Sequence, residues 1–435
     1  MIKKIGFAIV CLAFFGSYAQ DGTVSPYSYF GIGELRPATT VENQMMGGIG
    51  MYADSIHVNL QNPAAYADLG VRFGETFGLT TYTASISYRQ LTLKSASAEE
   101  SSRVTNLDYL ALAFTLKENL GVGIGIMPLS SVGYNLESIN QQDDAEGTLV
   151  TNRYTGSGGL NRVYTSIGWG ITDNLKIGVT ANFNFGTLES SRIQLVENVQ
   201  LATFDERASR INGMDLNYAL NYTPTFKDKY TLHTSLRVNT QANLTARNTQ
   251  RIGSVVADDQ SPVLGTELEV SEVNLEASGL KETAVKIPTT TTLGLGYGQD
   301  AKWFIGAEYS FQDLGSYVNP FLQFDNLLYQ NASTIAFGGF WVPDHTSFKY
   351  FQRITYRAGL RMEKTGMVVN DTDIDNFGIT FGVGLPLARS FSNLNLGFEI
   401  GKRGTTDANL IEEGYFKINI GLSLNDQWFR KAKVN

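Results

Sequence analysis

The side chains best suited to chemistry in this sequence include a ladder of three arginines. Arg353, Arg357 and Arg361 recur at every fourth residue, on what period-two alternation makes the polar face of a predicted strand. Guanidinium groups so placed could hold the carboxylate headgroup of a ligand through paired hydrogen bonds. The alternative is that they pair within the chain, with Glu399, Asp375 or carboxylates of the N-terminal region. Charges enclosed by strands commonly satisfy one another, and we favour the pairing.

Catalytic residues are sparse. The three histidines, His57, His233 and His345, are isolated, and no two have the spacing of metal ligands. His233 shares its predicted strand face with Thr231 and Ser235, but neighbours of that kind occur by chance, and a hydrolase needs a serine oriented beside a histidine. We therefore expect no enzyme activity, no metal and no cofactor.

A glycine cluster opens an irregular stretch, residues 47–70, that is too glycine-rich for a helix and too interrupted for a strand. It follows no strand and lacks the Lys-Ser/Thr pair of a phosphate-binding loop. We expect residues 20–70 to form a plug, or hatch, inside whatever the rest of the chain builds. The residues assigned to the hatch are Gly47, Gly48, Gly50, Asn62 and Pro63.

Residues 1–19 have the features of a secretory signal. Lys3 and Lys4 precede an apolar run, and a small-x-small site ends at Ala19. Cys11, the only cysteine, would leave with the signal, so the mature chain would form no disulfides. Without these two lysines the chain keeps 32 basic and 42 acidic residues, which argues against a nucleic-acid partner.

From residue 71 to 435 the hydrophobic pattern has a period of two, which is typical of strands. Between 175 and 185, for example, apolar residues alternate with lysine, glycine, threonine and asparagine. Charged residues make up only 17% of the chain, against about 25% in typical proteins. A soluble sandwich and a membrane barrel both give such alternation, so loop lengths must separate the two.

Long polar gaps alternate with mostly tight ones along the chain, as expected when one end of a barrel carries short turns and the other long loops. The pattern predicts an all-β transmembrane antiparallel β-barrel of about 14 strands. Trp428 and Phe429 follow the last strand, where an aromatic girdle would meet the membrane interface. The predicted strands are 75–91, 106–116, 120–135, 158–171, 174–190, 208–224, 230–246, 285–297, 302–312, 333–342, 352–362, 375–386, 392–401 and 414–425.

Four short motifs resemble the FadL/TodX (OmpP1-like) outer-membrane transport family: Gly47 to Asp54, Asn62-Pro63-Ala64, the stretch 127–134 and the stretch 156–160. The resemblance implies a fourteen-stranded barrel in the outer membrane with a hatch in its lumen. It also implies passive uptake of hydrophobic molecules such as long-chain fatty acids, released sideways through the wall. The sequence departs from the family in the segment 25–35 before the hatch and in a polar insertion, 247–284.

Pro128 interrupts the third predicted strand. Proline cannot donate to a strand ladder, so a central strand needs a bulge or a break there. One interpretation is a lateral opening, with Gly125, Pro128 and Ser130 as gating residues. The other is that the strand ends early and Pro128 begins an outer loop.

The predicted loop 313–332 is unusually apolar for an outer loop. Phe321, Phe324, Leu327 and Leu328 could capture a hydrophobic ligand, dock a partner, or fold over the barrel mouth. The expected partners are outer-membrane lipid, a hydrophobic small molecule and other outer-membrane or secretion-complex proteins. The competing function is a non-transporting accessory or plug subunit of a larger complex, such as a type IX secretion translocon. A continuous apolar tunnel would favour transport, whereas a packed lumen would favour the subunit.

Overall fold

The computed structural model describes residues 22–73, 76–141, 147–256, 267–324, 326–387 and 391–427. The predicted signal sequence, Trp428 and Phe429 lie outside the described residues. Within these ranges no helix is both long and apolar enough to cross a membrane.

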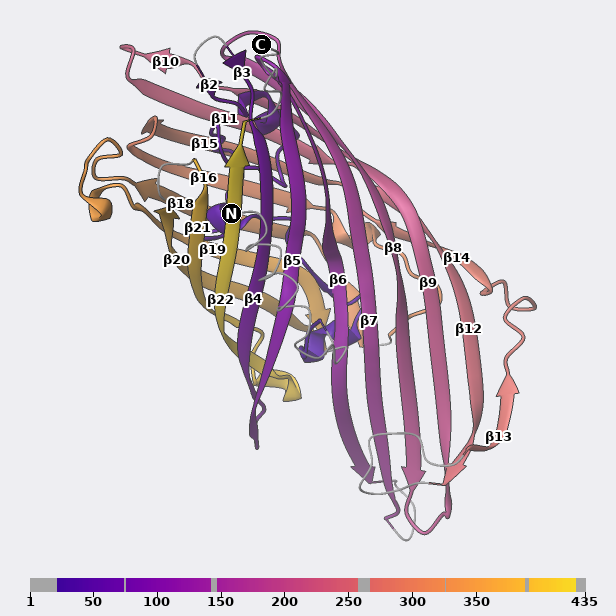
Figure 1. Cartoon of the computed structure of the whole chain (residues 1–435). Coiled ribbons are helices and arrows are strands. Elements are labelled where there is room, and N and C mark those ends of the chain that lie inside the picture. Colours follow the sequence, from indigo (N-terminus) through magenta and orange to yellow (C-terminus); the bar gives the residue numbers. More distant parts are fainter. Residues whose placement is uncertain are drawn as a thin grey trace, which may run out of the picture.

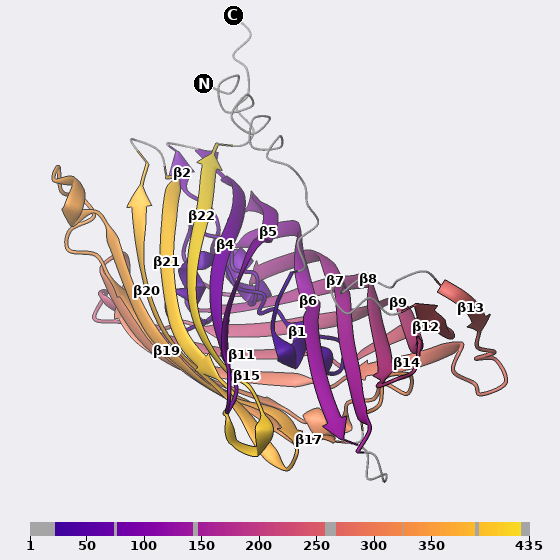
Figure 2. The same ribbon diagram turned by 90° about the horizontal axis from the view of Figure 1, so that it is seen from below.

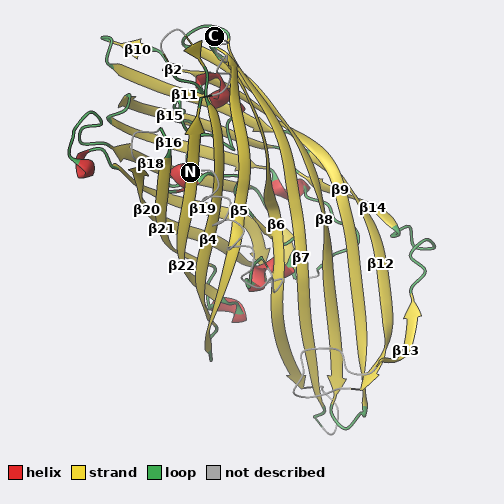
Figure 3. Cartoon of the chain, viewed as in Figure 1, coloured by secondary structure: helices red, strands yellow, loops and turns green. Residues whose placement is uncertain are grey.

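The chain forms a closed antiparallel β-barrel of fourteen strands, as the alternation predicted (Figure 3). Two of the fourteen wall strands are interrupted, one between β11 and β12 and one at Pro288 between β14 and β15; each pair continues along the same neighbour. The wall elements are β4 (Thr80–Lys94), β5 (Glu99–Lys117), β6 (Leu120–Gln141), β7 (Leu149–Gly170), β8 (Leu175–Val196), β9 (Leu201–Tyr222), β11 (Tyr230–Asn239), β12 (Ala242–Val256), β14 (Glu282–Ile287), β15 (Thr290–Gln299), β16 (Trp303–Gln312), β18 (Ala332–Trp341), β19 (Thr355–Val369), β20 (Thr372–Pro386), β21 (Asn393–Arg403) and β22 (Glu412–Asp426).

Closure joins the last wall strand to the first. β22 pairs with β4 from Glu412↔Lys94 to Asp426↔Thr80, so neither strand leaves a free edge at this junction. Short elements complete the fold: η1 (Pro26–Tyr29), β1 (Glu34–Leu35), α2 (Val41–Gln44), η2 (Pro63–Asp68), β2 (Arg72–Phe73), β3 (Thr76–Phe77), β10 (Thr225–Phe226), β13 (Glu267–Glu272), η3 (Leu314–Ser316), β17 (Leu327–Tyr329), η4 (Tyr350–Gln352) and η5 (Asp407–Asn409).

An apolar belt surrounds the barrel. Ile167 and Trp169 of β7, Phe183 of β8, and Met214 and Tyr218 of β9 are exposed on the outer face. The belt on β7 and β8 spans roughly the ten residues that a tilted strand needs to cross a bilayer. Exposing these apolar side chains to water would cost free energy, whereas contact with the acyl chains of lipid does not.

One side of the barrel stands far beyond the belt. β6, β7, β8 and β9 each have 22 residues, and Figure 1 shows them as the longest arrows, extending past β4 and β5. On β7, residues 149–161 add about 40 Å at roughly 3.3 Å per residue.

The predicted loops at 136–157 and 191–207 are therefore wrong, because most of both ranges is strand. These extensions lie beyond the apolar belt, where the outer face carries Thr151, Arg153, Thr155 and Ser157. Strands with polar residues on that face lack the apolar alternation on which the prediction relied.

The N-terminal region fills the lumen. α2 contacts β20, β21 and β22, while η2 contacts the inner faces of β5 to β9. Glycines make this close approach feasible: a Cβ on Gly338 would lie 2.0 Å from the Met46 carbonyl oxygen, and one on Gly121 would lie 2.0 Å from that of Tyr66. The inward glycines of the wall thus leave room for the plug.

A larger residue at Gly178 should dislodge the plug. Its Cβ would lie 2.2 Å from the carbonyl carbon of Pro63, and overpacking of a tight contact costs about 1–3 kcal/mol. We expect Gly178→Leu to raise ion conductance in planar bilayers. The control is Ala181→Leu, on the lipid side of the same strand, which should keep the conductance of the parent; equal conductance in both variants would contradict the contact.

Candidate functional site

The barrel wall comes apart between β5 and β6. These strands pair only from Leu110↔Ile126 to Lys117↔Leu120, although β5 continues to Glu99 along β4 and β6 continues to Gln141 along β7. We call the unpaired stretch, 99–109 of β5 facing 127–141 of β6, the lateral seam. Figure 1 shows the two strands separating along it.

Both strands are irregular where the seam begins. The register of β5 against β4 skips Asp108, and that of β6 against β7 skips Leu129, directly after Pro128. A bulge bends its strand and increases the local twist, so two bulges on facing strands turn their edges apart. Pro128 removes one donor from the ladder at this point.

The N-terminal segment 22–36 takes the place of β5 along the seam. β1 pairs with β6 through Glu34↔Ser131 and Leu35↔Ser130, and Figure 2 shows β1 between β5 and β6. The backbone N–H of Arg36 donates to the carbonyl oxygen of Leu129 at 2.9 Å.

Ser28, which precedes β1, continues this pairing along the edge of β6. The Ser28 hydroxyl accepts a hydrogen bond from the N–H of Gly133 at 3.1 Å and lies 3.2 Å from the carbonyl oxygen of the same residue. The edge of β6 is thereby satisfied from Leu129 to Gly133. Gly33 (φ +90°) permits the approach, since a Cβ there would lie 2.5 Å from the Ser131 carbonyl oxygen.

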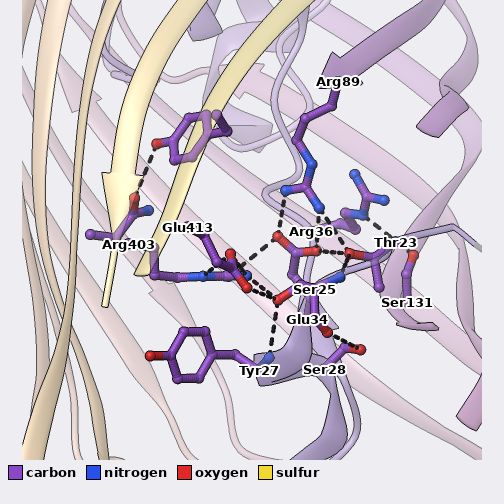
Figure 4. A network of polar contacts seen from close by, with 12 residues as sticks. Thr23, Ser25, Tyr27, Ser28, Glu34, Arg36, Arg89, Ser131, Arg403 and Glu413 are labelled. Carbon is purple, nitrogen blue, oxygen red and sulfur yellow. Dashed lines mark hydrogen bonds and ion pairs between the residues drawn. The ribbon is translucent and has the colours of Figure 1, made fainter. Parts of the chain in front are cut away.

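Buried ion pairs fasten this segment to the barrel (Figure 4). Both carboxylate oxygens of Glu34 accept from Arg89 of β4, at 2.6 and 2.7 Å, and Arg403 of β21 lies 3.3 Å from Glu34. Arg403 also binds Glu413 of β22 at 2.6 Å. We call Glu34, Arg89, Arg403 and Glu413 the anchor.

Further bonds surround the anchor. The Ser25 hydroxyl donates to Glu413, and the Tyr27 hydroxyl donates to the carbonyl oxygen of Ile411 at 2.7 Å. The Thr23 hydroxyl donates to Glu34, and the Arg36 guanidinium reaches the Ser131 hydroxyl at 3.3 Å.

Two carboxylates and two guanidiniums leave the anchor neutral. The side chain of Glu34 is 9% exposed and that of Glu413 is 1% exposed. Burial alone would raise the pKa of Glu34, but Arg89 and Arg403 outweigh burial and hold that pKa well below its usual range. The carboxylate of Glu34 is therefore ionised across the neutral pH range.

A cavity of about 370 Å³ lies above the segment, against the inner faces of β6 to β9. We call it the vestibule. Tyr29 packs edge-on against Tyr134 at 5.1 Å and against Tyr154 at 5.7 Å, and Phe324 lies 4.8 Å from Tyr29. Arg192 lies over the ring of Tyr154 at 5.6 Å. The vestibule therefore offers aromatic faces beside a cation.

A second cavity, of about 450 Å³, lies deeper, between the plug and the wall. Its lining is rich in charge: Arg162 binds Asp215 at 2.9 Å, and Arg361 binds Glu399 at 2.9 Å. We call it the polar chamber. Charged pairs of this kind suit water or polar groups, while apolar side chains such as Ile32, Met127 and Leu314 line other parts of the chamber.

The predicted hatch residues are locked to one another and to the wall. The N–H of Gly47 donates to Thr380 at 3.0 Å, and that of Gly50 donates to Glu308 at 3.0 Å. Asn62 caps η2 and donates to Asn221 of β9 at 3.0 Å. The remaining hatch residues also make close backbone contacts, with Gly48 donating to Asn43 and Pro63 lying against Gly178.

The predicted gating residues lie together at the lower end of the seam. Gly125 pairs with Ala111, one step before the last β5–β6 pair. Pro128 precedes the bulge, and Ser130 pairs with Leu35 of β1. Their role in gating stays a prediction.

The arginine ladder is only partly assembled. Arg353 lies in the loop before β19, with its guanidinium 5.6 Å from the centre of the Tyr350 ring, because the strand begins at Thr355. Arg357 donates to Asn395 at 3.1 Å, and Arg361 binds Glu399 as described. The three therefore do not form one headgroup site.

The histidines are separated, too. His57, in the plug, binds Asp54 at 2.7 Å; His233 packs against Tyr52 and Phe304; His345 lies in the loop after β18. Among the described residues, no group of three His, Cys, Asp or Glu side chains is placed to hold a metal.

The apolar loop 313–332 folds down over the plug. Phe321 is buried beside Arg207, Phe324 packs on Tyr29 and Phe30, and Leu327 packs against the cluster around Tyr27. Leu328 remains exposed in β17, which pairs with β19. The loop thus closes part of the barrel mouth and lines the vestibule.

Sequence reasoning missed the anchor. Glu34 precedes the glycine-rich stretch 47–70, and its partners Arg89, Arg403 and Glu413 are dispersed over the first and the last two wall strands. Charges on the lumen face of predicted strands were a usable signal. One sequence does not show which acidic side chain pairs with which basic one.

Removing the charge of Glu34 should loosen segment 22–36. Glu34→Gln leaves Arg89 without its ion-pair partner, and breaking a buried pair costs about 3 kcal/mol. We expect amide exchange in the segment to accelerate by about 100-fold. Glu118→Gln is the control, because Arg72 and Glu118 are 63% and 53% exposed and such pairs contribute about 0–1 kcal/mol. Equal protection in both variants would contradict the anchor.

Acid should release the same segment. Because the folded-state pKa of Glu34 is depressed, its stabilisation is present above the unfolded pKa of about 4.3 and is lost as the pH falls through the folded pKa. A spin label at Leu35→Cys should be immobile at neutral pH and mobile in acid. In a Glu34→Gln background it should be mobile at both. An acid transition of the same size in that background would assign the effect to another group.

The chain is similar in fold to several solved outer-membrane channels. The CymD monoaromatic hydrocarbon channel superposes with a TM-score of 0.55 at 12% identity, covering 92% of this chain and 99% of that one. The Ralstonia pickettii toluene transporter TbuX gives 0.55 at 13% identity, with 91% and 99% covered. A Pseudomonas aeruginosa FadL homologue gives 0.56 at 10% identity, with 91% and 100% covered.

At this identity the similarity shows the fold alone, and it confirms the FadL/TodX-like architecture expected from the sequence. No curated protein matches the chain in sequence. The model of the BamG family matches residues 1–435. The chain therefore belongs to the BamG family and has the fold of FadL-type channels.

Proposed function

We propose that this protein is an outer-membrane channel that passes hydrophobic molecules from the vestibule sideways through the lateral seam. The observation that carries the proposal is that the chain's own N-terminal segment, rather than a neighbouring wall strand, closes the seam. A two-residue strand and one serine hold far fewer ladder bonds than a full strand would, so this part of the wall can open without breaking the barrel.

Adjacency of the vestibule and the seam supports this route. Ser28 and Gly31 line the vestibule, and Ser28 is also bonded to the edge of β6. The segment is thus the partition between the two. Withdrawing it would connect an aromatic cavity to the lipid beside Leu107 of β5, which is exposed on the outer face.

Release into the wall suits a hydrophobic ligand better than passage down the lumen. The polar chamber and the hatch lie below the vestibule, and an apolar molecule there would lie against the charged side chains Arg162 and Arg361. Lipid at the lower end of the seam, beside Leu107, offers the opposite environment. Solved channels of this fold are titled a toluene transporter and a monoaromatic hydrocarbon channel, which supports the same substrate class here. Movement down a concentration gradient needs no cofactor or energy source.

A different observation supports a second function. The hatch is tied to the wall by hydrogen bonds from Gly47, Gly50 and Asn62 and by the ion pair between Asp68 and Lys176. Charged side chains line the lumen below the vestibule. A plug held in this way suits a non-transporting subunit of a larger outer-membrane complex. Such a subunit would carry stoichiometric protein partners and no hydrophobic ligand.

A disulfide across the seam separates the two functions. The mature chain is expected to lack cysteine, and Leu35 and Ser130 are direct partners, so the double variant Leu35→Cys/Ser130→Cys should cross-link β1 to β6. In proteoliposomes, oxidation should abolish uptake of a fluorescent long-chain fatty acid or toluene, and reduction should restore it.

The matched control is Ser166→Cys/Thr180→Cys, across the intact β7–β8 pair, which should transport in both redox states. Uptake that survives oxidation of the seam pair would reject lateral release. Absence of uptake in the parent protein, together with co-purifying protein partners, would leave the subunit function.

A further inference from the structure

A loop at the short-turn end of the barrel departs from its neighbours. Residues 342–354 join β18 to β19 at the end where β15 and β16 are joined by the tight turn 300–302. Short turns mark the periplasmic end of outer-membrane barrels. In Figure 2 this loop, with η4 in it, stands clear of the strand ends and away from the plug.

The loop presents large aromatic side chains to its surroundings. Phe348 is fully exposed and Phe351 is 76% exposed, with Tyr350 and Lys349 between them. A single exposed aromatic needs no explanation, but a contiguous group marks a surface that is covered in use.

The aromatic side chains are held outward by an ordered backbone. The N–H of Asp344 donates to the carbonyl oxygen of Gln352 at 2.8 Å, which closes the base of the loop. Asp344 also accepts from Thr346 at 2.7 Å, and the N–H of Lys349 donates to Ser347 at 3.1 Å. The loop therefore does not collapse onto the barrel to hide its apolar groups.

The loop continues an aromatic girdle on the wall. Trp341 and Tyr356 lie 5.9 Å apart at the base of the loop, and the Tyr356 hydroxyl donates to the carbonyl oxygen of Phe351 at 3.3 Å. Along the same rim, Tyr297 lies 5.9 Å from Trp303. Aromatic residues at this level of a barrel sit at the membrane interface, so the loop begins where lipid headgroups begin.

Basic side chains accompany the aromatic ones. Lys349 lies between Phe348 and Tyr350 in the sequence, and the guanidinium of Arg353 is 5.6 Å from the Tyr350 ring centre. The N–H of Val342 donates to the carbonyl oxygen of Lys302, which brings that turn beside the loop. Aromatic rings with flanking Lys and Arg fit a surface of acyl chains capped by phosphates.

We propose that the loop 342–354 inserts into the membrane: Phe348 and Phe351 enter the periplasmic leaflet, while Lys349 and Arg353 contact lipid phosphates. The partner is lipid rather than a periplasmic protein, because the loop continues the lipid-facing girdle and carries the charge that phosphates attract. This inference does not depend on what the channel carries.

Site-specific fluorescence tests the membrane insertion of this loop in the full chain. The variants Phe348→Cys and Phe351→Cys would be labelled with an NBD fluorophore in nanodiscs of phosphatidylethanolamine and phosphatidylglycerol. Both labels should be quenched by lipids carrying a nitroxide near the headgroup, and quenched several-fold less by aqueous iodide than the same label at Asp228→Cys, in the β10–β11 turn. A label at Ile167→Cys, in the apolar belt, is the lipid-exposed reference.

Iodide quenching at 348 and 351 equal to that at Asp228 would overturn the proposal. A photo-crosslinking amino acid at position 348 in intact cells gives an independent result. Adducts to phospholipid support the insertion of the loop into the membrane, whereas a discrete protein adduct overturns it. Heat-modifiable gel mobility would first confirm that each variant forms the barrel.

Discussion

The structure depends on satisfying the backbone of β6 where it has lost its neighbour. An N–H or C=O that is buried without a hydrogen-bond partner costs about 1–3 kcal/mol. Two bulges turn β5 and β6 apart, yet the peptide groups of Leu129, Ser131 and Gly133 on β6 all have partners. Those partners come from residues 28–36, which explains why this chain has an ordered segment before the glycine-rich stretch 47–70.

That requirement links parts of the molecule that would otherwise be independent. The segment reaches β6 only if Gly33 allows close approach and if Glu34 is held by Arg89 and Arg403. Its other face lines the vestibule through Tyr29. The wall, the cavity above it and the ion pairs therefore form one assembly, and a change in any of them is felt at the seam.

The sequence predicted the belt well and the regions outside it poorly, for a physical reason. Alternation in 175–185 reflects lipid on one side and plug on the other, so β8 was recognisable. Above the belt, water replaces lipid, and residues 149–161 of β7 are strand without an apolar face.

Pro128 signalled a break, because a proline in a central strand must be accommodated. That the separation runs along β5, and that β1 fills it, depends on contacts between residues far apart in the sequence, such as Arg36 with Ser131, 95 positions later. The sequence prediction placed Arg353 on a strand, whereas β19 begins two residues later, at Thr355. The alternation of polar residues extends beyond the hydrogen-bonded part of the strand.

The position of the anchor also has a consequence for assembly. Glu34 precedes the first wall strand, Arg89 lies on that strand, and Arg403 and Glu413 lie on the last two. These four side chains meet only after β22 has found β4. The full set of ion pairs around Glu34 can therefore form only once the cylinder is closed, so the contacts that hold the N-terminal segment in the wall are completed last.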